Sequence, residues 1–312
     1  MLDVRRLQFL VELSHRATIA AVAEALHMSP SGISQQLALL EREAGAALLE
    51  RVGRGVRLTD AGRQLAERGA DILAALELAH AELRSGEEPP TGTCRVAAFG
   101  SAARALVPSL LDCQRRHAGL RVELVESEPE VAVPGLLSGE FDLVVSEEYP
   151  GTTSELPRHV HREVLGTDPL EMVVSTSLLG ERDVVKEGAN LPWALEPVGA
   201  TSRAWAVQHC LGLGFSPTVQ YESYDLELLL LLVHQGAAAS ILPKLVLPPH
   251  RETAKSPAKS PSLRSPAATL TRLDTGWSRR LVSLARQARE RDPSVRAVRE
   301  ALRERFSIRQ SE

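Results

Sequence analysis

The segment 18–40 constrains the fold of this chain most strongly, because it predicts two short helices separated by a tight break. Small apolar residues fill the first helix, and the pattern is interrupted before Pro30. Ser29 is a good N-cap, and Pro30 suits the first helical position, where its missing N–H costs nothing. The second helix repeats apolar side chains at the spacing of a buried stripe: Ile33, Leu37 and Leu40. The segment therefore predicts a helix-turn-helix.

The outward face of the second helix is short, polar and uncharged, which suits contacts with base edges in a DNA major groove. We expect the DNA contacts at the helix start and along this face: Ser29, Ser31, Gly32, Ser34, Gln35 and Gln36. The alternative is an ordinary helical hairpin, since two amphipathic helices near an N-terminus are common. The residues that follow favour DNA binding.

Residues 48–62 come after a glycine stop at Gly45, and they alternate arginine with glycine in the pattern of a two-stranded wing. Arg51, Arg54 and Arg57 are the expected phosphate or minor-groove contacts. The alternative is a solvated hairpin. The position of this segment beside the helix pair favours a DNA-binding wing.

Residues 1–62 resemble the winged helix-turn-helix of the LysR-type transcriptional regulators. The matching residues are Leu7-Gln8-Phe9-Leu10, Ala20 to Ser29, Ser34-Gln35-Gln36-Leu37, Leu40-Glu41, Gly45, Leu48 to Arg51 and Leu58 to Gly62. The chain departs from the family pattern at Leu49, where the family usually has Phe, and at Gln35, where many members carry Arg. The resemblance implies a regulator that binds double-stranded DNA, with RNA polymerase as a further partner.

Composition limits the classes of function. The 312 residues include 36 Lys and Arg against 40 Asp and Glu, so any attraction to DNA must be local. The sequence shows no secretory signal and no apolar run long enough for a membrane span, which predicts a cytoplasmic protein with no membrane partner. Cys94, Cys113 and Cys210 lack metal-ligand spacing, so we expect buried thiols and neither metal nor cofactor. A redox switch at Cys210 is the alternative.

Residues 59–85 form one long helical pattern with apolar residues alternately four and three positions apart, which predicts a seam for a partner helix. The expected dimer contacts are Leu65, Ile72, Leu76 and Leu83. The alternative is packing on its own domain. Two recognition helices in a dimer, or in a tetramer, would bind the half-sites of an interrupted palindrome. This helix follows a DNA-binding domain at 1–58 and precedes a hinge at 86–93, where Pro89-Pro90 opposes helix.

From residue 94 the pattern alternates strands and helices, which predicts an α/β domain with a parallel sheet. We expect lobe 1 at about 94–165 and 268–312, and lobe 2 at about 166–250. The Ser/Pro/Lys-rich segment 251–266 predicts a disordered insertion where the chain crosses back. The expected fold class is therefore a winged helix-turn-helix, a linker helix and a two-lobed α/β domain.

Ligands of open α/β sheets bind at the carboxyl ends of strands, beside helix N-termini. Two helix starts and two strand ends carry suitable groups: Gly100, Ser101, Ala102 and Arg104; Thr201, Ser202 and Arg203; Ser146 and Glu147; and Glu222. The hydroxyls and backbone N–H groups would accept a carboxylate, and the glutamates would favour an ammonium group. These groups predict an effector that is a carboxylate or resembles an amino acid. The alternatives are that Ser and Thr only cap their helices, as they do in most helices, and that Glu147 is simply solvated.

The second half resembles, more loosely, the periplasmic-binding-protein-like effector domain of the same family. The matching pieces are Arg95-Val96, Gly139 to Leu143, Gly214-Phe215, Gln235-Gly236 and Ile241-Leu242-Pro243. The resemblance implies effector contacts at Ser101, Ser146 and Thr201 to Arg203.

A second hypothesis, an enzyme, lacks a nucleophile elbow, a phosphate loop or a metal-spaced cluster, so we expect no catalytic residues. A third hypothesis, a DNA-binding protein without an effector, predicts a collapsed or apolar-filled cleft.

Overall fold

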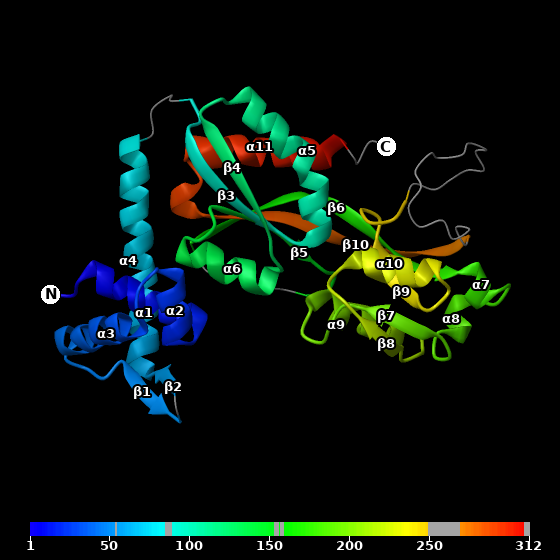
Figure 1. The fold of residues 1–312 in the computed structure, drawn as a ribbon, viewed down its shortest axis with the longest axis horizontal. Helices are drawn as coiled ribbons and strands as arrows, with labels where there is room; N and C mark the ends of the chain where they lie inside the picture. Colours follow the sequence, from blue (N-terminus) through cyan, green and yellow to red (C-terminus); the bar gives the residue numbers. More distant parts are fainter. Residues whose placement is uncertain (54, 85–88, 153–155, 157–158, 249–268, 309–312) are drawn as a thin grey trace.

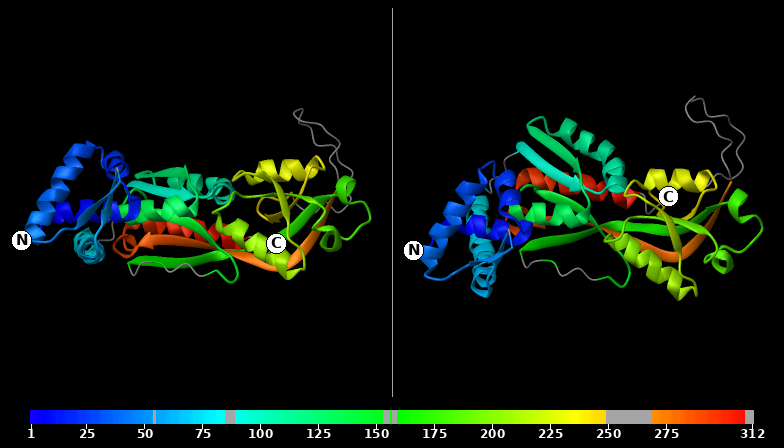
Figure 2. Two further views of the ribbon diagram at one scale, coloured as in Figure 1. Left: turned by 90° about the horizontal axis from the view of Figure 1, so that it is seen from below. Right: turned by 60° about the horizontal axis from the view of Figure 1, so that its bottom comes forward.

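The computed structural model describes residues 1–53, 55–84, 89–152, 156, 159–248 and 269–308, with no side-chain description for 80–84 and 307–308. The DNA-binding domain lies at one end of an elongated molecule, and lobe 2 lies at the other end, with lobe 1 between them (Figures 1 and 2).

The N-terminal domain is a helix-turn-helix with a two-stranded wing. Its elements are α1 (Val4–Arg16), α2 (Ile19–Ala25), α3 (Pro30–Ala44), β1 (Leu49–Val52) and β2 (Gly55–Leu58). The expected start of α3 is confirmed, because the Ser29 hydroxyl caps the helix by accepting the N–H of Gly32 at 3.1 Å. The helix ends at Gly45 in the left-handed conformation, with φ of 65°. The stripe of Ile33, Leu37 and Leu40 is buried in the domain core.

The long helix α4 (Asp60–Arg84) connects this domain to the rest of the molecule. Its first turns lie against the wing and α1, and two glycines permit this packing. A Cβ on Gly62 would lie 2.1 Å from the carbonyl oxygen of Leu48, and one on Gly69 would lie 3.1 Å from Val11. The expected hinge is only partly described: 86–88 lie outside the described residues, and β3 already begins at Gly92.

Lobe 1 carries a sheet covered on both faces. Its elements are β3 (Gly92–Ala98), α5 (Gly100–Arg116), β4 (Leu120–Glu126), α6 (Pro129–Ser138), β5 (Leu143–Glu148), the short η1 (Gln287–Arg289) and α11 (Pro293–Ile308). Strands β3, β4 and β5 are parallel, as expected. Helices α5 and α11 cover one face and α6 covers the other (Figure 1).

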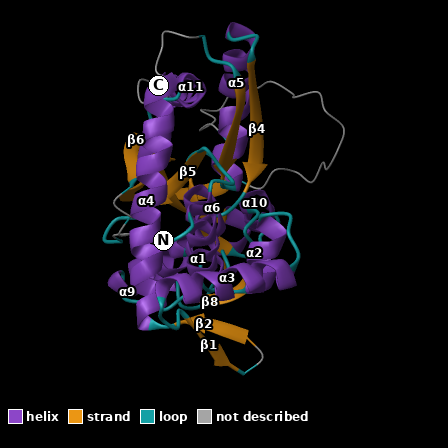
Figure 3. Cartoon of the chain, turned by 90° about the vertical axis from the view of Figure 1, so that its left-hand side faces the viewer, coloured by secondary structure: helices purple, strands orange, loops and turns teal. Residues whose placement is uncertain are grey.

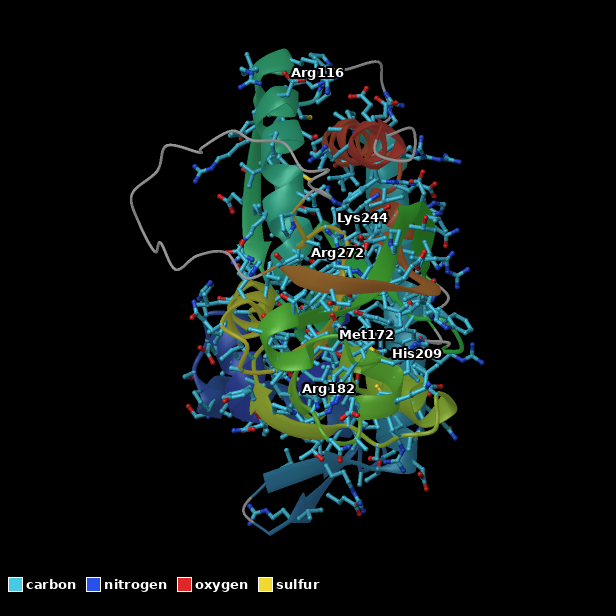
Figure 4. The ribbon with its side chains drawn as sticks, turned by 90° about the vertical axis from the view of Figure 1, so that its right-hand side faces the viewer. Arg116, Met172, Arg182, His209, Lys244 and Arg272 are labelled. Atoms are coloured by element: carbon cyan, nitrogen blue, oxygen red, sulfur yellow. The ribbon has the colours of Figure 1, made fainter. Side chains whose placement is uncertain are left out.

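Lobe 2 repeats this plan with smaller elements. They are α7 (Thr176–Leu179), α8 (Val184–Glu187), β7 (Pro192–Leu195), α9 (Thr201–Gly212), β8 (Thr218–Glu222), α10 (Leu226–His234) and β9 (Ala239–Pro243). Figure 4 views this lobe from its free end, with Met172 inside the core.

Two long antiparallel strands join the lobes: β6 (Val160–Ser175) and β10 (Leu270–Arg286). Together with the strands of both lobes they form one sheet of eight strands, in the order β4-β3-β5-β10-β6-β9-β7-β8. Residues 270–274 of β10 pair with 171–175 in lobe 2, so the crossing lies within β10. The lobe boundary expected at 268 is corrected to a point inside this strand. The segment 251–266 lies outside the described residues.

Candidate functional site

Helix α3 lies at the same end of the molecule as the wing (Figure 3), and its outward face carries exposed polar side chains. Ser31, Ser34 and Gln35 are exposed, while the apolar stripe of the helix faces the core. Exposed hydroxyl and amide groups on a helix of 15 residues can reach base edges in a major groove. These three residues are the exposed part of the expected contact set, although the Ser31 hydroxyl also hydrogen-bonds the Ser29 hydroxyl at 3.2 Å.

The other expected contacts on α3 already have partners inside the domain. Ser29 and Gly32 form the helix cap at 3.1 Å. The Gln36 side chain is half-buried and accepts a hydrogen bond from Nε of Arg6 at 3.0 Å. These residues therefore fix the position and orientation of α3, whereas Ser31, Ser34 and Gln35 face outward.

The wing is a short antiparallel hairpin in which Leu49 pairs with Leu58 and Val52 with Gly55. Arg51 and Arg57 are exposed, and Arg57 forms a cross-strand ion pair with Glu50 at 2.6 Å. An exposed pair of this kind contributes little to stability, so the arginine remains available to a phosphate. Arg54 lies outside the described residues.

The expected dimer seam on α4 divides into two parts. Leu65 packs against the core of its own domain, in agreement with the alternative interpretation for that residue. Ile72 and Leu76 are 41% and 49% exposed, which leaves an apolar strip on the helix. The Leu83 side chain lies outside the described part of the helix.

A buried arginine that the sequence interpretation missed joins the elements at the junction of the lobes. Arg279 of β10 is 1% exposed. Its guanidinium donates to Asp168 of β6 at 2.8 and 3.0 Å, to the hydroxyl of Ser101 at 2.8 Å, and to Glu147 at the end of β5. The guanidinium also lies over the ring of Phe99, 4.9 Å from its centroid. One cation therefore connects two long strands, a strand end and a helix start.

This cluster changes the expected roles of two residues. The helix start at Ser101 was expected to accept an anion, and Glu147 was expected to attract an ammonium group. In the structure both residues bind Arg279, because burial of a charge requires partners. A ligand would meet them only alongside, or in competition with, this internal partner.

Beside the cluster, a groove of about 470 Å³ opens between the lobes. It is bounded by the start of α6, the end of β5, the start of α9 and β10; the expected residues among its lining are Ser146, Glu147 and Thr201. Thr201 donates to Glu130 of α6 at 3.4 Å across the groove, which brings the two lobes into contact. The sequence did not identify Glu130, whose position at a helix start was its only signal.

The remaining expected residues lie around this groove rather than in it. Arg104 of α5 reaches across to Asp225 at 3.8 Å and Glu227 at 3.4 Å at the start of α10, which makes an exposed contact between the lobes. Arg203 pairs with Glu222 at 3.2 Å within lobe 2.

Three of the residues expected at the effector site lie elsewhere in the structure. Ala102 is buried in the core of lobe 1, and Gly100 lies against Glu126. Ser202 lines a separate small cavity behind the start of α9.

The electrostatics of this region are dominated by carboxylates. Burial, together with Glu147 and Glu130, raises the pKa of Glu128 to about 7. Burial, together with Glu147 and Glu128, raises the pKa of Glu196 to about 8. Burial also raises the pKa of Glu147, against the opposing effect of Arg279. These carboxyl groups therefore oppose one another's ionisation, and part of the group is protonated near neutral pH.

The three cysteines are buried and free. Burial raises the pKa of each thiol, that of Cys210 to about 12, so the thiolate needed for reaction with an oxidant is scarce. This environment opposes the redox alternative. Within the described ranges, no group of His, Cys, Asp and Glu has the geometry of a metal site, and no helix is long and apolar enough to cross a membrane.

A winged helix-turn-helix joined to a two-lobed domain with a groove defines a class: DNA-binding transcription regulators that carry a ligand-binding domain. Two family models match this chain. Residues 4–63 match the bacterial regulatory helix-turn-helix protein model of the lysR family, and residues 87–307 match the LysR substrate binding domain. The chain belongs to the LysR family of transcriptional regulators.

Curated relatives and solved structures agree with this assignment. The chain is 24% identical to the transcriptional dual regulator GltC of Bacillus subtilis over 269 residues, which cover 84% of this chain and 88% of GltC. It is 28% identical to the regulator BsdA of the same organism over 257 residues, 80% of this chain and 86% of BsdA.

Full-length OxyR from Pseudomonas aeruginosa has a similar fold, with a TM-score of 0.64 at 18% identity, over 97% of this chain and 95% of OxyR. CbnR in complex with its target DNA matches with a TM-score of 0.50 at 22% identity, over 98% of this chain and 100% of CbnR.

Proposed function

We propose that this regulator binds an interrupted palindrome as a homodimer or homotetramer, through α3 and the wing, and that a small molecule in the interlobe groove controls this binding. The proposal that the protein binds DNA rests on the exposure of Ser31, Ser34 and Gln35 on the face of α3 opposite its buried stripe. The exposed Ile72 and Leu76 on α4 support pairing with a second copy. A regulator of this kind acts where the DNA is, in the cytoplasm, and RNA polymerase is its expected further partner.

The wing is tested by the double variant Arg54→Ala/Arg57→Ala. Loss of two phosphate contacts per subunit is expected to weaken operator binding roughly tenfold or more, and to reduce the slope of log affinity against log salt concentration by about two units per subunit. Gel-shift titrations at several salt concentrations measure both quantities. An unchanged affinity and slope would remove the wing from the interface.

The groove favours an effector-responsive regulator over a DNA-binding protein without an effector, because it is open and lined by both polar and apolar side chains rather than collapsed. Ligand control then requires only that the ligand bind two states of the protein with different affinities.

Thr201→Trp tests the effector site. Thr201 is exposed on the rim of the groove, so an indole at this position would fill the groove without disturbing the core. We expect the variant to bind operator normally and to lose the thermal stabilisation that the small-molecule fraction of a cell extract gives the unmodified protein. Gln208→Trp, on the exposed face of the same helix, is the matched control. Equal stabilisation of both variants would contradict a ligand site in the groove.

A further inference from the structure

The interlobe region holds more carboxylates than cations. Glu130 and Glu147 line the groove, and Glu196 lines the small cavity beside it. Glu128 lies near enough to Glu147 for each to feel the charge of the other. Arg279 is the cation that acts on this group, and its guanidinium is already shared among Asp168, Glu147 and Ser101.

The other nearby cations are also engaged. Arg203 borders the small cavity but donates to the carboxylate of Glu222 at 3.2 Å and to the backbone oxygen of Glu196 at 2.9 Å. Arg162 and Arg280 both bind Glu148 at the end of β5. In the described part of the chain, no ion pair to a basic side chain is recorded for Glu128, Glu130 or Glu196. A ligand that carries positive charge would therefore meet carboxyl groups at this site rather than competing basic side chains.

The small cavity has the size and lining of a pocket for an ammonium group. Its volume is about 20 Å³, room for one water-sized group, and Tyr149, Glu196, Ser202 and Trp205 border it. Ser202 is 8% exposed, and its hydroxyl lies beside Glu196 without a hydrogen bond of normal geometry to any described residue. The Ser202 hydroxyl is close enough to Glu196 to oppose the rise in its pKa but is poorly aligned with it, and an ammonium donor placed between them would satisfy both oxygens at once.

The two hollows lie at adjacent residues of the first turn of α9, because Thr201 lines the groove and Ser202 lines the small cavity. We propose that this site takes an organic cation whose primary ammonium group binds between Glu196 and Ser202, with its carbon chain in the groove toward Glu130 and Glu147. The inference rests on the proposed function, in which the groove binds the effector, and it assigns the charge of that effector. The rings of Tyr149 and Trp205, with centroids 5.6 Å apart, make part of the cavity wall apolar, which favours an organic cation over a hydrated metal ion.

Protonation supplies a second signature of this site. Because the pKa of Glu196 is raised to about 8, the carboxyl is mostly protonated at pH 7 and must lose its proton when a cation binds. Cation affinity should therefore rise between pH 6.5 and pH 8.5. Glu147, Glu128 and Arg279 are the charged groups that act on Glu196, and Ser202 lies against it.

Isothermal titration of the full chain with 1,4-diaminobutane, butylamine and succinate tests the proposal. We expect the diamine to bind more tightly than the monoamine, since its second ammonium group can reach Glu130 and Glu147, and we expect no binding of succinate. The measured enthalpy of diamine binding at pH 7 should change with the ionisation enthalpy of the buffer, because a proton is released.

Glu196→Gln keeps the size of the side chain and removes its charge. Diamine affinity should fall roughly tenfold or more, the loss expected for a charge-assisted hydrogen bond, and the proton release should disappear. Glu181→Gln makes the same change on the exposed surface of lobe 2, outside the groove, and should bind the diamine as the unmodified protein does. Thermal unfolding of both variants checks that they fold.

Binding of succinate in place of the amines, with tighter succinate binding by Glu196→Gln, would overturn the cation assignment and leave an effector site of opposite preference. Failure of both amines to bind would also overturn it. The effector function itself is decided by Thr201→Trp and the cell extract, so the two proposals fail separately.

Discussion

Replacement of Arg279 by leucine is expected to lower the melting temperature of the protein by roughly 10 °C, the largest effect of any single change considered for this chain. The guanidinium is buried and holds Asp168, Glu147 and Ser101 together at the junction of the lobes. Removal of one partner from a buried ion pair costs about 3–5 kcal/mol, because the other charge stays buried without compensation. Thermal unfolding of the full chain, followed by circular dichroism, measures the change.

The loss of stability in Arg279→Leu should depend on pH in a predictable direction. Burial raises the pKa of Glu147 in the folded protein, and removal of Arg279 takes away the group that opposes this shift. The folded state then binds more protons than the unfolded state, so the destabilisation is small below the unfolded pKa and grows as pH rises through the folded value. The melting temperature of Arg279→Leu should therefore be closer to that of the unmodified protein at pH 5 than at pH 8.

Arg280→Leu is the matched control, because Arg280 is the next residue of β10 but is exposed and pairs with Glu148 at 3.0 Å. Its loss should cost less than about 1 kcal/mol, as for other surface pairs. Equal destabilisation by the two variants would contradict a specific structural role for the buried cluster.

Gln35→Glu is expected to weaken operator binding by roughly a hundredfold. Gln35 is exposed on the outward face of α3, and a carboxylate there would meet the negative field of the DNA and lose one amide donor. Gln35→Arg should retain binding but change the preferred base, since arginine favours guanine. Gel-shift competition among operator variants distinguishes these two outcomes.

Gln208→Glu introduces the same charge on an exposed face of α9, far from the wing and α3 in Figure 1. Operator affinity should be unchanged in this control. If Gln35→Glu also bound operator with unchanged affinity, α3 would not present this residue to DNA.

The DNA-binding domain was predictable because its signals are local. The cap at Ser29, the proline that follows it and the stripe of Ile33, Leu37 and Leu40 all act within one or two turns, and the structure confirms each of them. The exposed or paired state of Gln36 was not predictable, because its partner Arg6 lies 30 residues away in another helix.

The connecting strands were harder to predict. Residues 270–273 and 280–286 belong to one strand, β10, which continues through an irregularity between Asp274 and Trp277. Gly276, at φ of 71°, lets the strand pass this bulge without ending. In the same way, β6 runs on to Ser175 because Pro169 is accommodated inside the strand rather than ending it.

The centre of the interlobe site depends on contacts that no local pattern encodes. Arg279 meets Asp168 across 111 residues and Ser101 across 178 residues. Local periodicity indicates which residues start helices and end strands, but it does not indicate which buried cation occupies the space between them. The helix start at Ser101 was identified correctly, and the group that binds to it required the structure.

Footprinting of the purified protein on the DNA immediately upstream of its own gene, at a stated salt concentration, tests the central claim most directly. The proposed function predicts specific protection of an interrupted palindrome, with half-sites related by the two-fold symmetry of a dimer. Weak, salt-sensitive protection without sequence preference, there and across a random-sequence selection, would contradict a sequence-specific regulator.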